Sequence, residues 1–191
     1  AQHNVVINAA KEAGNHVMLA EGRGILDPSL TETGRLQAGC LRESIGRLGV
    51  ALDVVVTSPM VRALETTDIA FRGTQVLILA TSLHTETGIK VEGDDVAGQN
   101  CQKGSSADSQ MAKFPSIDFT HVEQEGNWIS DENEEAYFHP LTAEERLEPF
   151  RDWLQSLPFE NILIIGHSGF FKRFLTQDVK MGNCEIIERS L

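Results

Sequence analysis

Residues 161–171 read NILIIGHSGFF, and this stretch decides the fold. Residues 162–165 are four consecutive apolar residues, rich in β-branching and too few for an ordinary helix, so they predict a buried strand. Two glycines then enclose His167 and predict a turn, after which a helix is expected over residues 170–176. Backbone N–H groups at a helix start and a nearby imidazole both favour an anion. We expect this turn to form half of a phosphate pocket.

Two further apolar runs, residues 52–57 and 75–80, predict two more short strands. Between them, Ser58 and Pro59 predict a helix over residues 60–71, because serine caps helices and proline fits their first position. Strand, helix and strand with short links are typical of a parallel sheet covered by helices. The remaining chain predicts helices at 31–49 and 143–157, a mostly irregular segment at 1–20 and an edge strand at 184–190.

Composition favours one α/β domain over residues 1–191, with a partly helical insertion or lid at about 81–140. The net charge of −12 argues against a nucleic-acid or anionic-membrane surface, because either needs a basic face. No apolar run approaches the roughly 20 residues that span a bilayer. Three scattered cysteines indicate reduced thiols and a cytoplasmic protein. The sequence begins at Ala1, so it is either processed or starts partway into a longer polypeptide.

Three separate motifs share one family pattern. Residues 27–38 read DPSLTETGRLQA, residues 54–67 read VVVTSPMVRALETT, and residues 164–170 read IIGHSGF. Together, in this order, they resemble the histidine phosphatase superfamily, branch 1, also called phosphoglycerate mutase-like. The resemblance extends over most of the chain from Asp27 onward and is poor between 81 and 140. It implies a three-layer α/β/α sandwich with a mostly parallel central sheet.

The residue types in these motifs suit phosphoryl transfer, because charge on the transferred group is stabilised by fixed cationic donors. Arg62 can fork onto two phosphate oxygens, and His167 matches the second histidine of the family. The resemblance implies that both bind the phosphate and act in catalysis. It also implies a carboxyl proton donor in L-x-E, for which Glu86 is the candidate with one extra residue. The alternatives are a solvated arginine, a hydrogen-bonded histidine at a strand end and an exposed loop glutamate.

The nucleophilic histidine of the family lies in an R-H-G-x-x-x-x-N motif that this chain does not contain. Residues 1–5, AQHNV, resemble the end of its variant R-H-A-E-x-x-H-N. This register gives Asn4 the substrate-binding position, gives His3 a structural role and places the nucleophile just upstream of Ala1. A second register over residues 17–24 leaves too little chain before Leu30, so we favour the first.

The sequence therefore predicts a phosphatase, that is, a phosphoric monoester hydrolase, acting through a phosphohistidine on a small phosphorylated metabolite. The alternatives are a phosphoglycerate mutase-type phosphotransferase and an inactive phosphate-binding or regulatory module of the same fold. No metal or other cofactor and no nucleic-acid or membrane partner is expected, and the oligomeric state stays open.

Acidic residues at 94–95 and 131–135 are interpreted as a solvated face. Phe114, Ile117, Phe119 and Trp128 line a pocket or pack in the core, the core being favoured for at least half. Four further histidines are predicted at the surface: His16, His84, His121 and His139.

Overall fold

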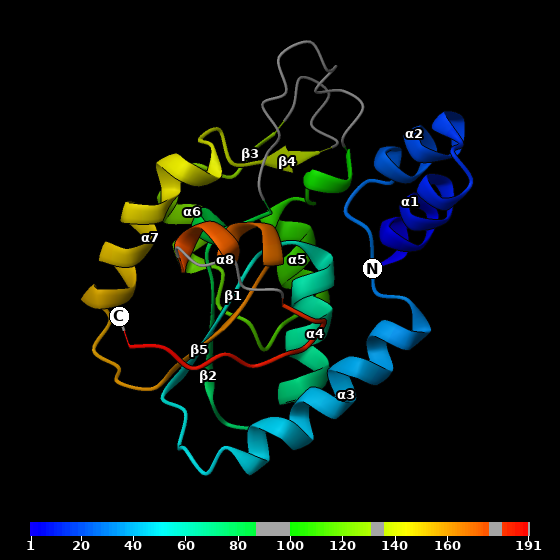
Figure 1. The fold of residues 1–191 in the computed structure, drawn as a ribbon. Coiled ribbons are helices and arrows are strands. Elements are labelled where there is room, and N and C mark those ends of the chain that lie inside the picture. The colour runs from blue at the N-terminus through cyan, green and yellow to red at the C-terminus, as the bar shows by residue number, and fades with distance from the viewer. Residues whose placement is uncertain (87–99, 131–135, 176–180, 191) are drawn as a thin grey trace.

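The computed structural model of the protein describes residues 1–86, 100–130, 136–175 and 181–190 (Figure 1). The predictions for residues 94–95 and 131–135 lie outside these ranges. The helices are α1 (Gln2–Glu12), α2 (His16–Gly24), α3 (Glu32–Arg47), α4 (Val61–Phe71), α5 (Ala107–Lys113), α6 (Thr120–Glu125), α7 (Ala143–Ser156) and α8 (Ser168–Phe174). The strands are β1 (Val54–Thr57), β2 (Leu77–Ala80), β3 (Ile129–Ser130), β4 (Tyr137–Phe138) and β5 (Ile162–Ile165), and the 3₁₀ turns are η1 (Ser82–His84) and η3 (Asn100–Gln102).

The central sheet consists of the three strands that the sequence predicts, all parallel, in the order β2-β1-β5. Val55 of β1 lies opposite Ile78 of β2 and Leu163 of β5. This register brings the carboxyl ends of β1 and β5 together, because Thr57 pairs with Ile165. The segments that follow these two strands, with Ser58 and His167, therefore meet at one edge of the sheet.

Side chains alternate between the two faces of a strand, and in β1 both faces are buried. Val55, on one face, belongs to a hydrophobic cluster with Leu41 of α3 and Leu64 of α4. Val56, on the other face, packs in a second cluster with Phe150 of α7 and residues of α8. Helices thus cover both faces of the sheet, which gives the predicted three-layer α/β/α arrangement (Figure 1).

The N-terminal segment is helical, so the prediction of a mostly irregular stretch at 1–20 is wrong. The α1 and α2 helices pack against each other (Figure 1). Their approach is close at Gly22, where an added Cβ would lie 2.8 Å from the Ile7 side chain. Asn15 caps α2 by accepting a hydrogen bond from the backbone of Met18 at 3.1 Å. The sequence pattern is weak because each helix has apolar residues on its exposed side, such as Val5 and Val17.

The C-terminal residues 184–190 form no strand, contrary to prediction. Cys184 adopts a positive φ of 56°, which departs from the extended conformation that a strand requires. The backbone N–H of Gly182 donates to the Glu185 carboxylate at 2.6 Å, and this hydrogen bond closes a turn that contains Cys184. The segment nevertheless lines the same cavity as β5.

The described residues between 100 and 130, where the sequence predicts an insertion, contain η3, α5 and α6. Phe114, Ile117, Phe119 and Trp128 are buried in the cluster that contains Val55, so all four pack in the core. The function of the insertion as a lid stays a prediction. No helix in the described ranges combines the length and the apolar character needed to cross a membrane.

Candidate active site

The position of Arg62 is set by an aspartate from the first sequence motif. The backbone N–H of Val61, in the first turn of α4, donates to the Asp27 carboxylate at 2.8 Å. Asp27 also accepts hydrogen bonds from Ser105 Oγ at 2.8 Å and Gln110 Nε2 at 3.0 Å. Burial raises the pKa of Asp27, against the lowering effect of these hydrogen bonds and of Arg62. The carboxylate therefore fixes the start of the helix that carries the arginine.

Arg62 directs its guanidinium into the interior, and only 7% of the residue is exposed. Its Nη1 donates to the backbone oxygen of Cys101 at 3.2 Å. Its Nη2 lies 3.6 Å from Glu86 Oε2 but donates no hydrogen bond within the described ranges. Buried donors are almost always paired. The N–H of Nη2 that donates no hydrogen bond in the described ranges could therefore donate one to an anionic ligand.

His167 follows β5 directly and is the N-cap residue of α8. Its Nε2 lies 2.9 Å from Ser58 Oγ, and its Nδ1 lies 3.6 Å from Glu86 Oε2. The imidazole is 5% exposed. Burial and the neighbouring Arg62 lower the pKa of His167 well below its ordinary value, so the ring is neutral near pH 7.

The Glu86 carboxylate connects the other two groups. Its Oε2 is 3.6 Å from both Arg62 Nη2 and His167 Nδ1, and 20% of its side chain is exposed. The residue follows the η1 turn, which in turn follows β2. The three predicted residues thus come from the ends of three neighbouring parallel strands and converge on one point. Glu86 is not an exposed loop residue.

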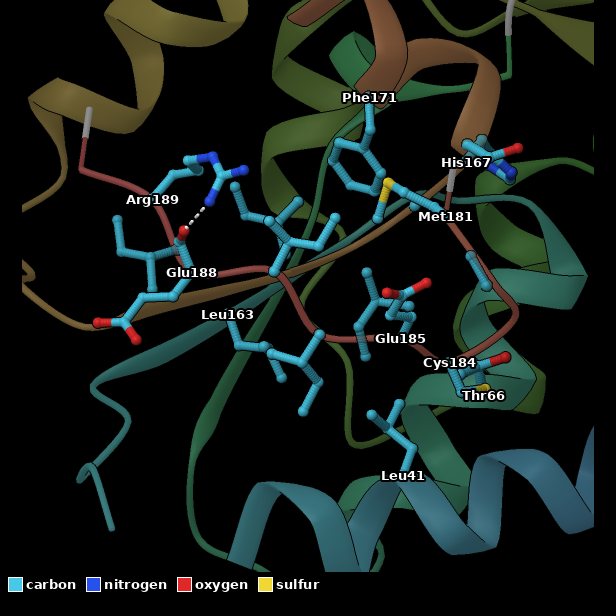
Figure 2. Close-up of a pocket in the computed structure, with 18 of the residues that line it drawn as sticks. Leu41, Thr66, Leu163, His167, Phe171, Met181, Cys184, Glu185, Glu188 and Arg189 are labelled. Atoms are coloured by element: carbon cyan, nitrogen blue, oxygen red, sulfur yellow. Dashed lines mark hydrogen bonds between the residues drawn. The ribbon is translucent and has the colours of Figure 1, made fainter. Parts of the chain in front are cut away.

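A cavity of about 830 Å³ opens from this point and runs along β5 (Figure 2). Asn4 lines it from α1, together with Arg62, Glu86 and His167, so all four predicted site residues face one space. The farther walls come from α3, β5, α8 and residues 181–190. Figure 2 shows that they carry apolar side chains, such as Leu41, Leu163 and Phe171, and charged ones, such as Glu185 and Glu188.

Two histidines that the sequence assigns to the surface are buried. His84 is fully buried, stacks on Phe150 at 4.8 Å and lies with Nε2 3.2 Å from the backbone oxygen of Ile165. Burial lowers its pKa to about 4, and burial lowers the pKa of His139 to about 4 as well. Neither residue belongs to a periodic pattern, so the sequence offers no signal for this burial. His3 is also buried, and burial, followed by Arg62, lowers its pKa to about 4.

Residues 14–89 match the model of the histidine phosphatase superfamily (branch 1). No curated protein sequence matches the chain. The ecdysone phosphate phosphatase of Bombix mori, solved with tungstate, aligns with a TM-score of 0.49 and 18% identity over 85% of this chain and 63% of that one. A mycobacterial glucosyl-3-phosphoglycerate phosphatase aligns with a TM-score of 0.45 and 19% identity over 85% and 74%.

The family match contains Asp27, Arg62 and Glu86, which are three of the residues around the charged end of the cavity. Over residues 14–89 this chain is therefore similar to the histidine phosphatase superfamily, branch 1.

Proposed function

We propose that the protein is a phosphoric monoester hydrolase that acts through a phosphohistidine on a small phosphorylated metabolite. The observation that carries the proposal is the buried Nη2 of Arg62, which donates no hydrogen bond in the described ranges and lies beside Glu86 and His167. A phosphate oxygen would supply the acceptor that this N–H lacks. The match of residues 14–89 to a phosphatase family supports the same chemistry.

The proposed reaction has two displacements. In the first, the nucleophilic histidine attacks phosphorus, the ester P–O bond breaks, and the Glu86 carboxylic acid protonates the leaving oxygen. In the second, water attacks phosphorus, the N–P bond breaks, and Glu86 takes up a proton from the water. In this proposal the nucleophile is the histidine that the resemblance of residues 1–5 implies just upstream of Ala1.

Arg62 and His167 stabilise the charge on the transferred phosphoryl group in this proposal. The guanidinium can donate two parallel hydrogen bonds to two oxygens. The neutral imidazole of His167 can donate one and, beside a phosphate dianion, it can also take up a proton. Asn4 lines the cavity at a position from which it contributes to substrate binding.

The test is a phosphate-ester panel on the full-length polypeptide, with the N-terminus verified by intact mass. Arg62→Ala should lower kcat/KM by about 10² to 10³, because one preformed donor to the transition state is lost. It should also abolish the rise in Tm that orthophosphate or vanadate produces. The matched control is Arg72→Ala, in which an exposed arginine at the other end of α4 is removed.

The outcomes separate the candidate functions. Absence of both turnover and thermal protection in the wild type would refute the proposal. Protection by orthophosphate without turnover would favour the phosphate-binding module. Transfer of phosphate to a second substrate in place of water would favour the phosphotransferase.

A further inference from the structure

Arg146 is the largest fully buried side chain of the described residues, with 1% of the residue exposed. It lies in the first turns of α7 and was not singled out by any sequence pattern. Burial lowers its pKa to about 10, so the guanidinium remains charged near neutral pH. Burying a cation is costly, and a buried arginine therefore needs many polar partners.

These partners lie on the segment that carries Glu86. Arg146 Nη1 donates to the backbone oxygen of Leu83 at 2.9 Å, to that of Thr85 at 3.2 Å and to Thr85 Oγ1 at 2.9 Å. Its Nη2 donates to the backbone oxygen of Glu86 at 3.3 Å. One guanidinium thus binds the backbone of Leu83, Thr85 and Glu86, which leads into the carboxylate.

The other side of Arg146 is fixed to two helices. Its Nε donates to the backbone oxygens of Leu141 and Thr142, each at 3.2 Å, just where α7 begins. Its guanidinium carbon lies 5.5 Å from the centre of the Phe170 ring. Phe170 is in the first turn of α8, which directly follows His167. Arg146 therefore connects the Glu86 segment with the helix that follows the active-site histidine.

The same segment is also bound by Glu125 of α6. The Glu125 carboxylate accepts hydrogen bonds from the backbone N–H of Ser82 at 3.1 Å and from the Ser82 and Thr81 hydroxyls. Residues 81–86 are thus fixed between an arginine and a glutamate. Of these two residues, Arg146 donates to the backbone oxygen of Glu86 itself, whereas Glu125 binds the start of the segment at Ser82.

We propose that Arg146 is a positioning residue that fixes the backbone of residues 83–86 and thereby keeps the Glu86 carboxylate between Arg62 and His167. This inference rests on the proposed function, in which Glu86 protonates the leaving oxygen. If the carboxylate is displaced, the transfer of its proton as the ester P–O bond breaks becomes inefficient. A poor leaving group needs that proton, and a good leaving group does not.

The experiment compares an alkyl phosphate, β-glycerophosphate, with 2,4-dinitrophenyl phosphate as substrates of the full-length polypeptide. Glu86→Gln should lower kcat for the alkyl ester by about a hundredfold and for the dinitrophenyl ester by less than about threefold. Arg146→Met should reproduce this selectivity, with a fall of about tenfold in the ratio of the two kcat values. Arg146→Lys, which keeps the charge but has fewer donors, should give a smaller fall in the same direction.

Arg151→Met is the matched control. Arg151 lies on the same helix, and its guanidinium carbon lies 5.3 Å from the centre of the Phe174 ring of α8, but its ion pair is with Glu148. Its replacement should leave the ratio of the two kcat values unchanged.

An equal loss on both substrates in a folded Arg146→Met protein, with the Glu86→Gln selectivity intact, would overturn the inference and leave the proposed function standing. If Arg146→Met does not fold, Arg146→Lys decides in the same way. A wild-type protein that hydrolyses neither ester and shows no rise in Tm with orthophosphate would refute the proposed function instead.

Discussion

The hydroxyl of Ser58 lies 2.9 Å from Nε2 of His167, although the two residues are 109 positions apart in the chain. The contact follows from the sheet, in which the Ser58 N–H donates to the backbone oxygen of Ile165 at 3.1 Å and continues the pairing of β1 with β5. Ser58, which follows β1, thus orients the imidazole of His167, which follows the neighbouring strand β5. The parallel arrangement of β1 and β5 is what assembles the charged end of the cavity.

Ser58→Ala should lower kcat/KM for phosphate esters by about tenfold to a hundredfold, because the His167 ring loses the partner that fixes its orientation. The loss of one buried hydrogen bond should also reduce the free energy of unfolding by about 1 kcal/mol. Steady-state kinetics and urea unfolding measure the two effects. Ser44→Ala, which removes an exposed hydroxyl on α3, is the control and should change neither quantity.

Gly166→Ala should destabilise the protein by about 1 to 3 kcal/mol, because the added Cβ overpacks a filled interior. This Cβ would lie 2.7 Å from Cδ2 of His84 and 3.1 Å from Cζ of Phe171. Gly46→Ala, in the middle of α3, meets no atom within 4 Å and should stabilise the protein by about 0.5 to 1 kcal/mol. Thermal unfolding of the two variants gives the comparison, and equal Tm values would contradict the packing argument.

The stability of the protein should fall as the pH decreases from about 6.5 to 4. The pKa of His84 is about 4 in the folded protein because the ring is buried, whereas an unfolded histidine has a pKa of about 6.5. Between these values the unfolded state binds a proton that the folded state excludes. This stabilisation, about 3 kcal/mol for His84, is therefore present above pH 6.5 and is lost toward pH 4.

Unfolding of the wild type near pH 5 should be accompanied by the uptake of about one proton by His84. His84→Phe should abolish this uptake, because the phenyl ring of the variant cannot titrate. Urea unfolding at several pH values measures this uptake as the slope of the free energy of unfolding against pH. Phe150→Leu, which disturbs the same ring stack without removing a titratable group, should lower stability equally at each pH. An unchanged slope in His84→Phe would show that other groups cause the pH dependence.

Asp27→Ala should reduce the free energy of unfolding by about 2 to 4 kcal/mol, because two buried donors and one partly buried donor each lose a hydrogen bond. The affinity for orthophosphate should also decrease, since Asp27 fixes the start of the helix that carries Arg62. Calorimetric titration with orthophosphate and urea unfolding measure these effects. Asp68→Ala removes the partner of an exposed arginine on the same helix and should cost less than about 1 kcal/mol.

Local sequence determined the strands of the sheet and the helices that flank them. The apolar runs that form β1, β2 and β5 contain short-range information, because β1 is buried on both faces and β2 and β5 are partly buried. Ser58 and Pro59 likewise indicate the start of α4, and the turn after β5 is visible as glycines around His167. Each of these features depends on residues that are neighbours in the chain.

Only the tertiary structure decided which side chains meet and which are buried. Glu86 lies between Arg62 and His167, Asp27 binds the start of α4, and Arg146 binds the backbone of residues 83–86. Each of these contacts joins residues more than twenty positions apart in the chain. The burial of His84, which stacks on Phe150 and lies beside the backbone of Ile165, likewise depends on distant residues. The pairing of α1 with α2 depends on a close approach at one glycine. Desolvation and hydrogen bonding act between neighbours in space, and a local sequence pattern does not specify these neighbours.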